Sequence, residues 1–174
     1  EEVTVGDHVL SRDEHDPNGP LSFQRITETH SNERSGFEYT TLLDLATGKV
    51  ETLGTTVHPF WVESTGSAGL APLADAVASH LDGKRHYARG ANGCVVLAER
   101  GWVYSADLKA GYVLKTADGR RVLVIAVKEQ QQLCRTYNLT VAGTHTYFVG
   151  AAAIWVHNTA GSGEYDFGES GYRE

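Results

Sequence analysis

The sequence has 174 residues, of which 41% are hydrophobic and 21% are charged. This composition is typical of a globular domain with a substantial core, and it excludes a disordered chain. No stretch approaches the about 18 to 20 apolar residues that a membrane-spanning helix needs. A formal net charge of -7 argues against a general affinity for nucleic acid or anionic lipid. We therefore expect neither a nucleic-acid partner nor a membrane partner.

Short segments rich in Val, Tyr, Thr, Leu and Ile follow one another along most of the chain, and Gly, Asp or Asn residues separate them. Turn residues recur at 47–49, 118–120 and 142–144, and Asp118-Gly119 between two apolar runs predicts a type I′ hairpin. The pattern predicts an all-β fold built of hairpins. The expected strands are 2–10, 37–45, 49–53, 55–62, 94–98, 101–108, 112–117, 121–129, 134–141 and 146–156.

One segment departs from the strand pattern. Apolar residues at helical spacing, with Pro72 near the start and Gly83 after the last turn, predict a single helix over about 71–82, inserted in the β-fold. The basic stretch 84–89 that follows is more typical of a solvated loop than of a nucleic-acid site. The tail 159–174 is rich in Gly, Ser and Glu without apolar periodicity, which indicates a linker or the start of another segment.

The cysteines and tryptophans favour structural roles. Cys94 and Cys134 lie far apart and show neither metal-binding nor disulfide spacing, so we expect them to be buried and unpaired. Trp61, Trp102 and Trp155 stand among alternating apolar residues and are expected to form part of the core.

The dipeptide His157-Asn158, at the end of an apolar run, suggests a chemical role. An Asn side-chain amide can attack its own backbone carbonyl, close a succinimide ring and expel the downstream amine. The chain would then be cut between Asn158 and Thr159. Because the amide is a poor nucleophile and the amine a poor leaving group, the carbonyl must be polarised and a proton must be donated, which is work that histidines can do.

Several residues could assist this reaction. His157 is adjacent, and His145, upstream of it, could reach the same point if the two segments lie side by side. Thr55 and His58, three residues apart, can aim a hydroxyl and an imidazole at one peptide group. Taken singly, each histidine is more often structural than catalytic. The three histidines could alternatively bind a metal, but no carboxylate or cysteine stands beside them at ligand spacing, so we expect no metal and no cofactor.

Four blocks in order carry a family resemblance: TTVHPFWV, GWVYSADLKAGYVLKTADG, YNLTVAGTHTYFVG and IWVHN. Together they resemble the Hint domain shared by inteins and hedgehog autoprocessing domains. They are closest to the Hint modules that precede C-terminal toxins in bacterial polymorphic toxin systems. The resemblance covers about residues 1–158 and implies a twisted all-β fold with pseudo-two-fold symmetry. The insertion at about 64–100 has no counterpart in it.

The resemblance also implies residue roles. Thr55 and His58 correspond to the TxxH motif that activates an N-terminal scissile peptide, and His145 corresponds to the histidine of the penultimate block. The last two residues of IWVHN correspond to the pair that performs C-terminal cleavage. Thr159 stands where inteins have Cys, Ser or Thr, and it could formally accept an acyl group.

The sequence departs from the family at one point, and this departure leaves two possible functions. Hint domains begin with Cys or Ser ahead of a stretch like EEVTVGDHVL, and this sequence starts inside that stretch. The resemblance therefore predicts no N-to-S acyl shift and no complete splicing, whereas Asn cyclisation needs no thiol. Two functions follow: a single-turnover self-cleaving module that releases a C-terminal segment, such as a toxin, or a dormant Hint scaffold that acts as a spacer for a C-terminal effector. In both, the partner is the protein's own flanking polypeptide, and whether the protein is secreted stays open.

Overall fold

The computed structural model describes residues 3–55, 58–64, 89–90, 93–94, 101–157, 167–168 and 171–172. Within these residues nearly every segment is strand or turn, and the one helical element is a 3-10 turn at Ser105–Asp107. The expected all-β fold is therefore confirmed. The helix expected over 71–82 and the basic stretch 84–89 lie outside the described residues, apart from Arg89 in a short strand.

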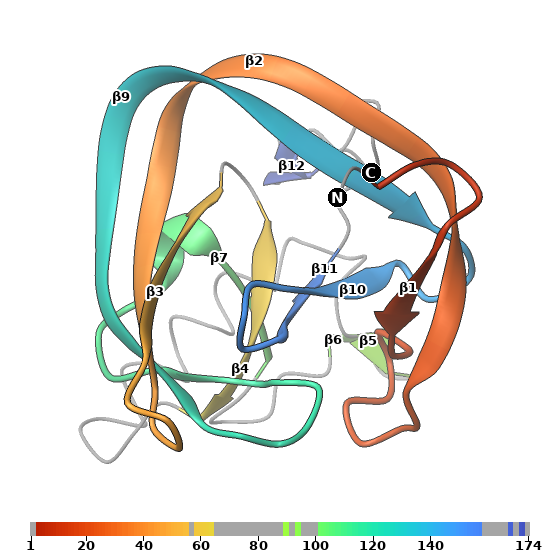
Figure 1. Cartoon of the computed structure of the whole chain (residues 1–174), viewed down its shortest axis with the longest axis horizontal. Helices are drawn as coiled ribbons and strands as arrows, with labels where there is room; N and C mark the ends of the chain where they lie inside the picture. The colour runs from red at the N-terminus through yellow and green to blue at the C-terminus, as the bar shows by residue number, and fades with distance from the viewer. Residues whose placement is uncertain are drawn as a thin grey trace.

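Nine of the described strands form one bent sheet in the order β1-β2-β9-β8-β4-β11-β10, with β3 paired to β2 and β7 paired to β4. In Figure 1 the long strands β2 and β9 arch around the outside, while β4, β7, β10 and β11 lie within the arch. The strands of this sheet are β1 (His8–Ser11), β2 (Ser22–Asp44), β3 (Val50–Thr55), β4 (Pro59–Ser64), β7 (Gly101–Tyr104), β8 (Val113–Leu114), β9 (Val122–Val141), β10 (Thr146–Val149) and β11 (Ile154–His157). Two further hairpins join β5 (Arg89–Gly90) to β6 (Gly93–Cys94) and β12 (Phe167–Gly168) to β13 (Gly171–Tyr172).

The two long strands give the sheet its pseudo-two-fold similarity. Each begins as the second arm of a hairpin, since β1 pairs with the start of β2 (Ser11↔Ser22) and β8 pairs with the start of β9 (Leu114↔Val122). The two hairpins meet where β2 and β9 pair antiparallel along most of their length. The first and last strands of the sheet also approach each other, because the hydroxyls of Ser11 and Thr146 lie 3.1 Å apart.

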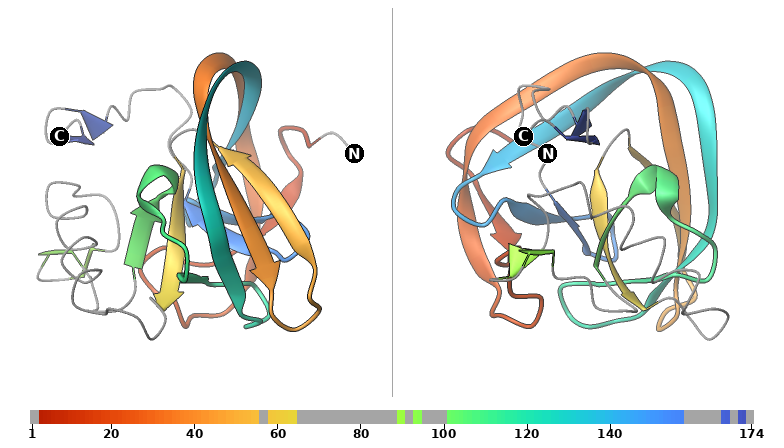
Figure 2. Two further views of the ribbon diagram at one scale, coloured as in Figure 1. Left: turned by 90° about the vertical axis from the view of Figure 1, so that its left-hand side faces the viewer. Right: turned by 180° about the vertical axis from the view of Figure 1, so that it is seen from behind.

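The β2–β9 ribbon differs from the strands predicted for it. Residues 22–36 were not expected to be a strand, and the two strands predicted at 121–129 and 134–141 are one continuous strand. Seen from the side in Figure 2, the ribbon rises above the other strands. Its exposed part has polar residues on both faces, so the apolar alternation that reveals a half-buried strand is missing there.

Two hairpin turns also correct the sequence interpretation. The predicted type I′ geometry at Asp118-Gly119 is wrong, because that turn needs positive φ at both central residues and here only Gly119 has it, at 80°. Asp118 Oδ1 instead accepts hydrogen bonds from Arg120 N and Thr116 Oγ1, each at 3.1 Å. The strand expected over 146–156 is a hairpin of β10 and β11.

A carboxylate on β3 holds that second hairpin turn. Glu51 accepts hydrogen bonds from Ala151 N at 2.9 Å and from Ala152 N at 3.1 Å. Gly150 has a φ of 72°, and a Cβ atom there would lie 2.8 Å from a Glu51 carboxylate oxygen. Glycine is favoured at this position, because other residues are strained at this φ and a Cβ atom would displace the Glu51 carboxylate.

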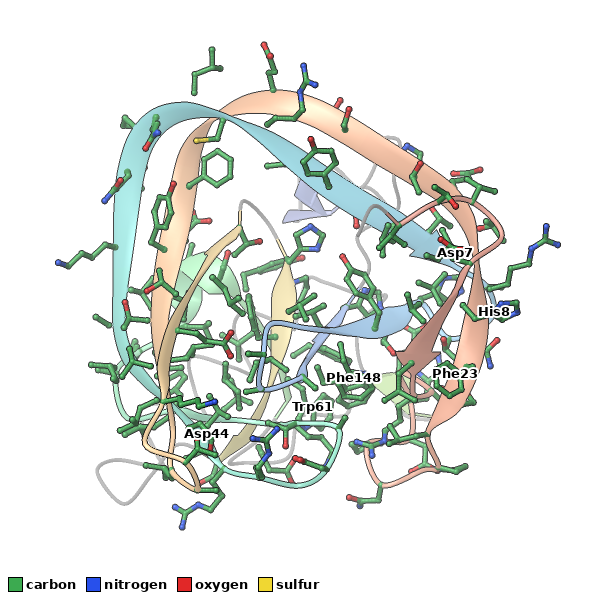
Figure 3. All side chains as sticks on the ribbon, in the orientation of Figure 1. Asp7, His8, Phe23, Asp44, Trp61 and Phe148 are labelled. Atoms are coloured by element: carbon green, nitrogen blue, oxygen red, sulfur yellow. The ribbon has the colours of Figure 1, made fainter. Side chains whose placement is uncertain are left out.

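The core centres on the three tryptophans, as expected. Trp61, Trp102 and Trp155 are at most 1% exposed, and their ring centroids lie 4.7 to 5.3 Å apart. Figure 3 places Trp61 and Phe148 within the ring of strands, whereas His8 points outward at its right-hand edge. Cys134 is unpaired but only half-buried, because it lies on the ribbon, so the expectation of full burial is wrong for it.

Candidate active site at the end of β11

Strand β11 ends at His157 and is buried along its whole length. Its sequence, IWVH, is apolar up to the histidine, as is typical of a strand covered on both faces. On one side Thr146 of β10 pairs with His157, and on the other side Phe60 of β4 pairs with Val156. Neighbouring strands on both sides therefore fix the backbone that leads to Asn158.

The His157 side chain is also held inside the protein. The residue is 5% exposed, and its ring packs edge-on against Trp102 with centroids 5.3 Å apart at 81°. Its Nε2 lies 2.5 Å from Oε2 of Glu14, a residue 143 positions earlier in the chain. Glu14 is itself buried, at 8% exposure.

The loop after β1 brings Glu14 to this place. The neighbouring Arg12 is buried, with its guanidinium carbon 5.5 Å from the Trp155 ring centre, and its Nε donates a hydrogen bond to the Gly19 carbonyl at 3.0 Å. Burial lowers the pKa of Arg12, and the carboxylates of Glu63 and Asp16 oppose that shift. The loop is thus pinned to the core.

His58 contacts the same strand end through the backbone. Its Nδ1 lies 3.3 Å from the carbonyl oxygen of His157, and since that oxygen can only accept, Nδ1–H is the donor. This carbonyl belongs to the peptide bond that joins His157 to Asn158. The His58 carbonyl in turn accepts a hydrogen bond from Ser105 N at 3.1 Å. His58 and His157 are therefore brought together.

Thr55 and His58 line one cavity of about 240 Å³. Thr55 is 8% exposed, and its buried Oγ1 has no hydrogen-bond partner among the described residues. A hydroxyl in that state can bond to a group that enters the cavity. The full lining among the described residues is Phe37, Gly54, Thr55, His58, Arg135, Thr136 and Tyr137.

His145 lies apart from these contacts. It is exposed, with a φ of 54°, and directly precedes β10. Its neighbour Thr146 is the register partner of His157. Ser11 fixes the position of this turn, because its Oγ lies 2.5 Å from Thr144 Oγ1 and donates to the Thr146 carbonyl at 2.6 Å. Asn158 and Thr159 lie outside the described residues, so the distance from His145 to either one stays a prediction.

Neither Glu14 nor Ser11 was predicted from the sequence to be a site residue. Glu14 stands in the run SRDEHD, whose many charged residues are typical of a solvent-exposed loop, and no spacing relates it to a histidine 143 residues later. Ser11 ends β1 and has the same difficulty, since its partners lie 133 and 135 residues away. Only the closure of the sheet brings these residues together.

The described part of the chain also limits two other kinds of site. Within it no group of three or more His, Cys, Asp or Glu side chains could hold a metal ion, so the alternative metal site on His58, His145 and His157 is not supported. Over the same residues no helix is long and apolar enough to cross a membrane.

Comparisons with known proteins bear on the identity of this fold. Residues 94–159 match the family described as the pretoxin HINT domain. The bacterial intein-like domain from Clostridium thermocellum is 21% identical with a TM-score of 0.58, over 88% of this chain and 83% of that one. The TvoVMA intein is 13% identical with a TM-score of 0.53, over 89% and 71% of the two chains. The transcription factor IIB Mvu mini-intein is 14% identical with a TM-score of 0.51, over 87% and 71%. No curated protein matches the sequence.

Because these identities are low, the solved structures establish only the fold. The family match is a similarity in sequence as well, and it covers the segment that contains β7 to β11. The resemblance inferred from the sequence is confirmed: the chain has the Hint fold of intein-like domains, and its residues 94–159 match the pretoxin HINT domain family.

Proposed function

We propose that this protein is a single-turnover autoprocessing domain that cuts its own chain between Asn158 and Thr159. The observation that carries the proposal is the contact of His58 Nδ1 with the carbonyl oxygen of His157, 3.3 Å away. It places an imidazole at the peptide bond immediately before Asn158. The Hint fold and the match to pretoxin HINT domains support the same conclusion.

The reaction is an asparagine cyclisation. The Asn158 side-chain nitrogen bonds to the carbonyl carbon of the same residue, and the bond from that carbon to the Thr159 nitrogen breaks. The attacking nitrogen loses one proton, and the departing nitrogen gains one. The products are a chain ending in a succinimide and a second chain with a free amine at Thr159. No water is consumed, so the masses of the two products sum to the mass of the parent.

Each site residue has a proposed role in this scheme. His157 donates a proton to the leaving amine, and His58 holds the preceding peptide in place by its hydrogen bond. We place His145 at the Asn158 carbonyl, where it would polarise the oxygen, because its neighbour Thr146 pairs with His157. Thr55 and His58 hydrogen-bond to a peptide that is bound in the cavity they both line.

The reaction uses no cofactor, and its partner is the flanking polypeptide. In this division residues 1–158 form the Hint domain, and the segment that begins at Thr159 is a linker or the start of the released cargo. A toxin is the class of cargo that the pretoxin HINT match favours. Thr159 corresponds to the residue that accepts an acyl group in inteins, and in the cleavage proposed here its nitrogen is the leaving group.

Two substitutions test the proposal. Asn158→Ala removes the side chain that closes the ring, so cleavage should be abolished while the melting temperature stays within error of the parent. His157→Ala should slow cleavage by about 100- to 10,000-fold, the usual contribution of one general acid or base, and leave a residual reaction. Both effects are measured by electrophoresis and mass spectrometry during incubation.

Asn32→Ala, on the exposed part of β2, is the matched control and should cleave like the parent. Equal cleavage of the Asn158→Ala chain would overturn the proposal. A parent chain that stays intact for days between about pH 5 and pH 8, the range in which histidine titrates, would leave the dormant scaffold as the function.

A further inference from the structure

We infer that Glu14 is the positioning residue of His157, and that its carboxylate holds the imidazole in the orientation needed for cleavage after Asn158. This inference rests on the proposed function. It adds a residue from the opposite end of the sequence to the site, at a position where neither the sequence pattern nor any motif pointed to one.

The contact is short and enclosed. Glu14 Oε2 lies 2.5 Å from His157 Nε2, and the two side chains are 11% and 6% exposed. A surface ion pair is weakened by solvent and by the mobility of both side chains, whereas this pair is screened from water. Burying a carboxylate without a partner is strongly unfavourable, so the position of Glu14 depends on His157 as much as the reverse.

The loop that carries Glu14 is fixed independently of that contact. The Glu14 carbonyl lies 3.5 Å from Trp102 Nε1, and the Trp102 ring also packs against the His157 ring. Two residues earlier, Arg12 N lies 3.4 Å from Thr146 Oγ1, and Thr146 is the strand partner of His157. The carboxylate is therefore placed by the same side chains that place the imidazole.

The chemical consequence concerns the two ring nitrogens. Because a carboxylate can only accept, Nε2 carries the proton in this pair, so Nδ1 is the ring nitrogen that would exchange a proton during cleavage. A carboxylate in this position orients the imidazole and compensates the positive charge of the ring when it holds a second proton. Both effects favour an imidazole that delivers a proton to the Thr159 amine.

Other titratable groups lie near this pair and bear on its pH dependence. His15 Nε2 lies 3.7 Å from the second Glu14 oxygen, and its side chain is 51% exposed. His58 contacts the His157 carbonyl, and Arg12 lies two residues before Glu14 on the same loop. Each of these three groups can carry a positive charge. Within the pair, Glu14 is the residue that carries the negative charge.

The test compares Glu14→Gln with a matched carboxylate. Glu14→Gln keeps the shape and an acceptor oxygen but loses the charge, and we expect cleavage to slow by about 10- to 100-fold, as for other residues that orient a reacting histidine. The pH above which the rate falls should also move downward. Glu14→Asp keeps the charge one methylene further away and should recover part of the rate.

Glu51→Gln is the control. Glu51 also holds the β10–β11 hairpin, but from the turn, at the end away from His157. The Glu51→Gln variant should lower the melting temperature by about as much as Glu14→Gln lowers it. Its cleavage rate and the pH profile of that rate should be unchanged. A purely structural role of Glu14 would make the two variants behave alike.

A second readout separates this inference from the proposed function. In the Asn158→Ala chain, which is expected to stay intact, proton NMR should show a strongly deshielded His157 Nε2–H signal that disappears when Glu14→Gln is added. Cleavage of Glu14→Gln at the parental rate and pH profile would overturn the positioning role and leave the proposed function intact. A parent that never cleaves would overturn the proposed function. The NMR signal, if it is present in Asn158→Ala and lost when Glu14→Gln is added, would then still show that Glu14 positions the imidazole, and its absence would overturn that role.

Discussion

The strands at the centre of the sheet and the exposed arch of the β2–β9 ribbon differ in how far their side chains are buried. Strands β4, β7 and β11 present almost only buried residues, and the three tryptophans meet there. In the arch, residues 27–33 and 128–133 are almost all exposed, and Leu133 and Tyr137 are 68% and 71% exposed. Yet the ribbon to which the arch belongs contains the longest strand pairing of the described residues, with register shifts at three points.

The comparison indicates what each region contributes. Backbone hydrogen bonds and exposed polar side-chain contacts, such as that of Arg135 with Glu33 at 3.5 Å, maintain the arch, and these do not fix side chains as a packed core does. Packing on both faces maintains the centre, and this fixes both the backbone and the rotamer of a residue such as His157. A reaction that depends on the placement of one imidazole therefore belongs on β11 rather than on the ribbon.

The largest expected effect is on the centre. Trp102→Ala should lower the free energy of unfolding by about 3 to 5 kcal/mol, because it opens a cavity between Trp61, Trp155 and His157. Denaturant unfolding followed by circular dichroism measures this loss. Cleavage should fall as well, since the His157 ring loses the surface against which it packs. A loss below about 1 kcal/mol would contradict the tight packing assigned to the centre.

Glu38 tests the border between the two regions. It pairs with Thr55, accepts a hydrogen bond from Ser105 Oγ at 3.1 Å, and has its pKa raised by burial from the ordinary value of 4.5. The folded state therefore holds this proton more tightly than the unfolded state, and stability falls as the pH rises from the ordinary pKa through the folded pKa.

Glu38→Gln removes this loss of folding stability at higher pH, because glutamine does not ionise. At neutral pH the variant should be more stable than the parent by less than about 1 kcal/mol, because the side chain is only partly shielded from solvent. The difference should vanish below the ordinary pKa of glutamate. Unfolding titrations of both proteins across this range provide the measurement, and an equal difference at every pH would show that burial of the charge is not its cause.

The smallest effect is expected on the arch. Leu133→Ala removes a side chain that is 68% exposed, and the free energy of unfolding should change by no more than about 0.5 kcal/mol. The cleavage rate should be unchanged. A loss of more than about 2 kcal/mol would mean that another surface covers the arch in solution, since such losses come from buried side chains.

The same contrast explains which features the sequence could reveal. Apolar alternation and turn residues predicted the central strands and the tryptophan core, because burial leaves a pattern. Residues 22–36 escaped prediction because the arch buries neither face there, and the β10–β11 hairpin was hidden because its turn, Gly150 to Ala153, is itself small and apolar.

The candidate site shows the same division. The pairing of a histidine with an asparagine and the spacing of Thr55 and His58 are local signals, so the sequence could indicate them. Glu14 could not be found in this way, because its contact with His157 exists only after β1 and β10 have come together at the closure of the sheet. Residues that act together and lie close in the sequence can be predicted from it, whereas a contact that forms only through the fold cannot.

The most direct test of the proposed function is the intact mass of the purified parent chain, followed over time near neutral pH. We expect the parent to disappear as two products form, with the break between Asn158 and Thr159, and the two early product masses should sum to the mass of the parent. A sum larger by the mass of one water would indicate hydrolysis instead of cyclisation. A single unchanged mass would contradict self-cleavage altogether.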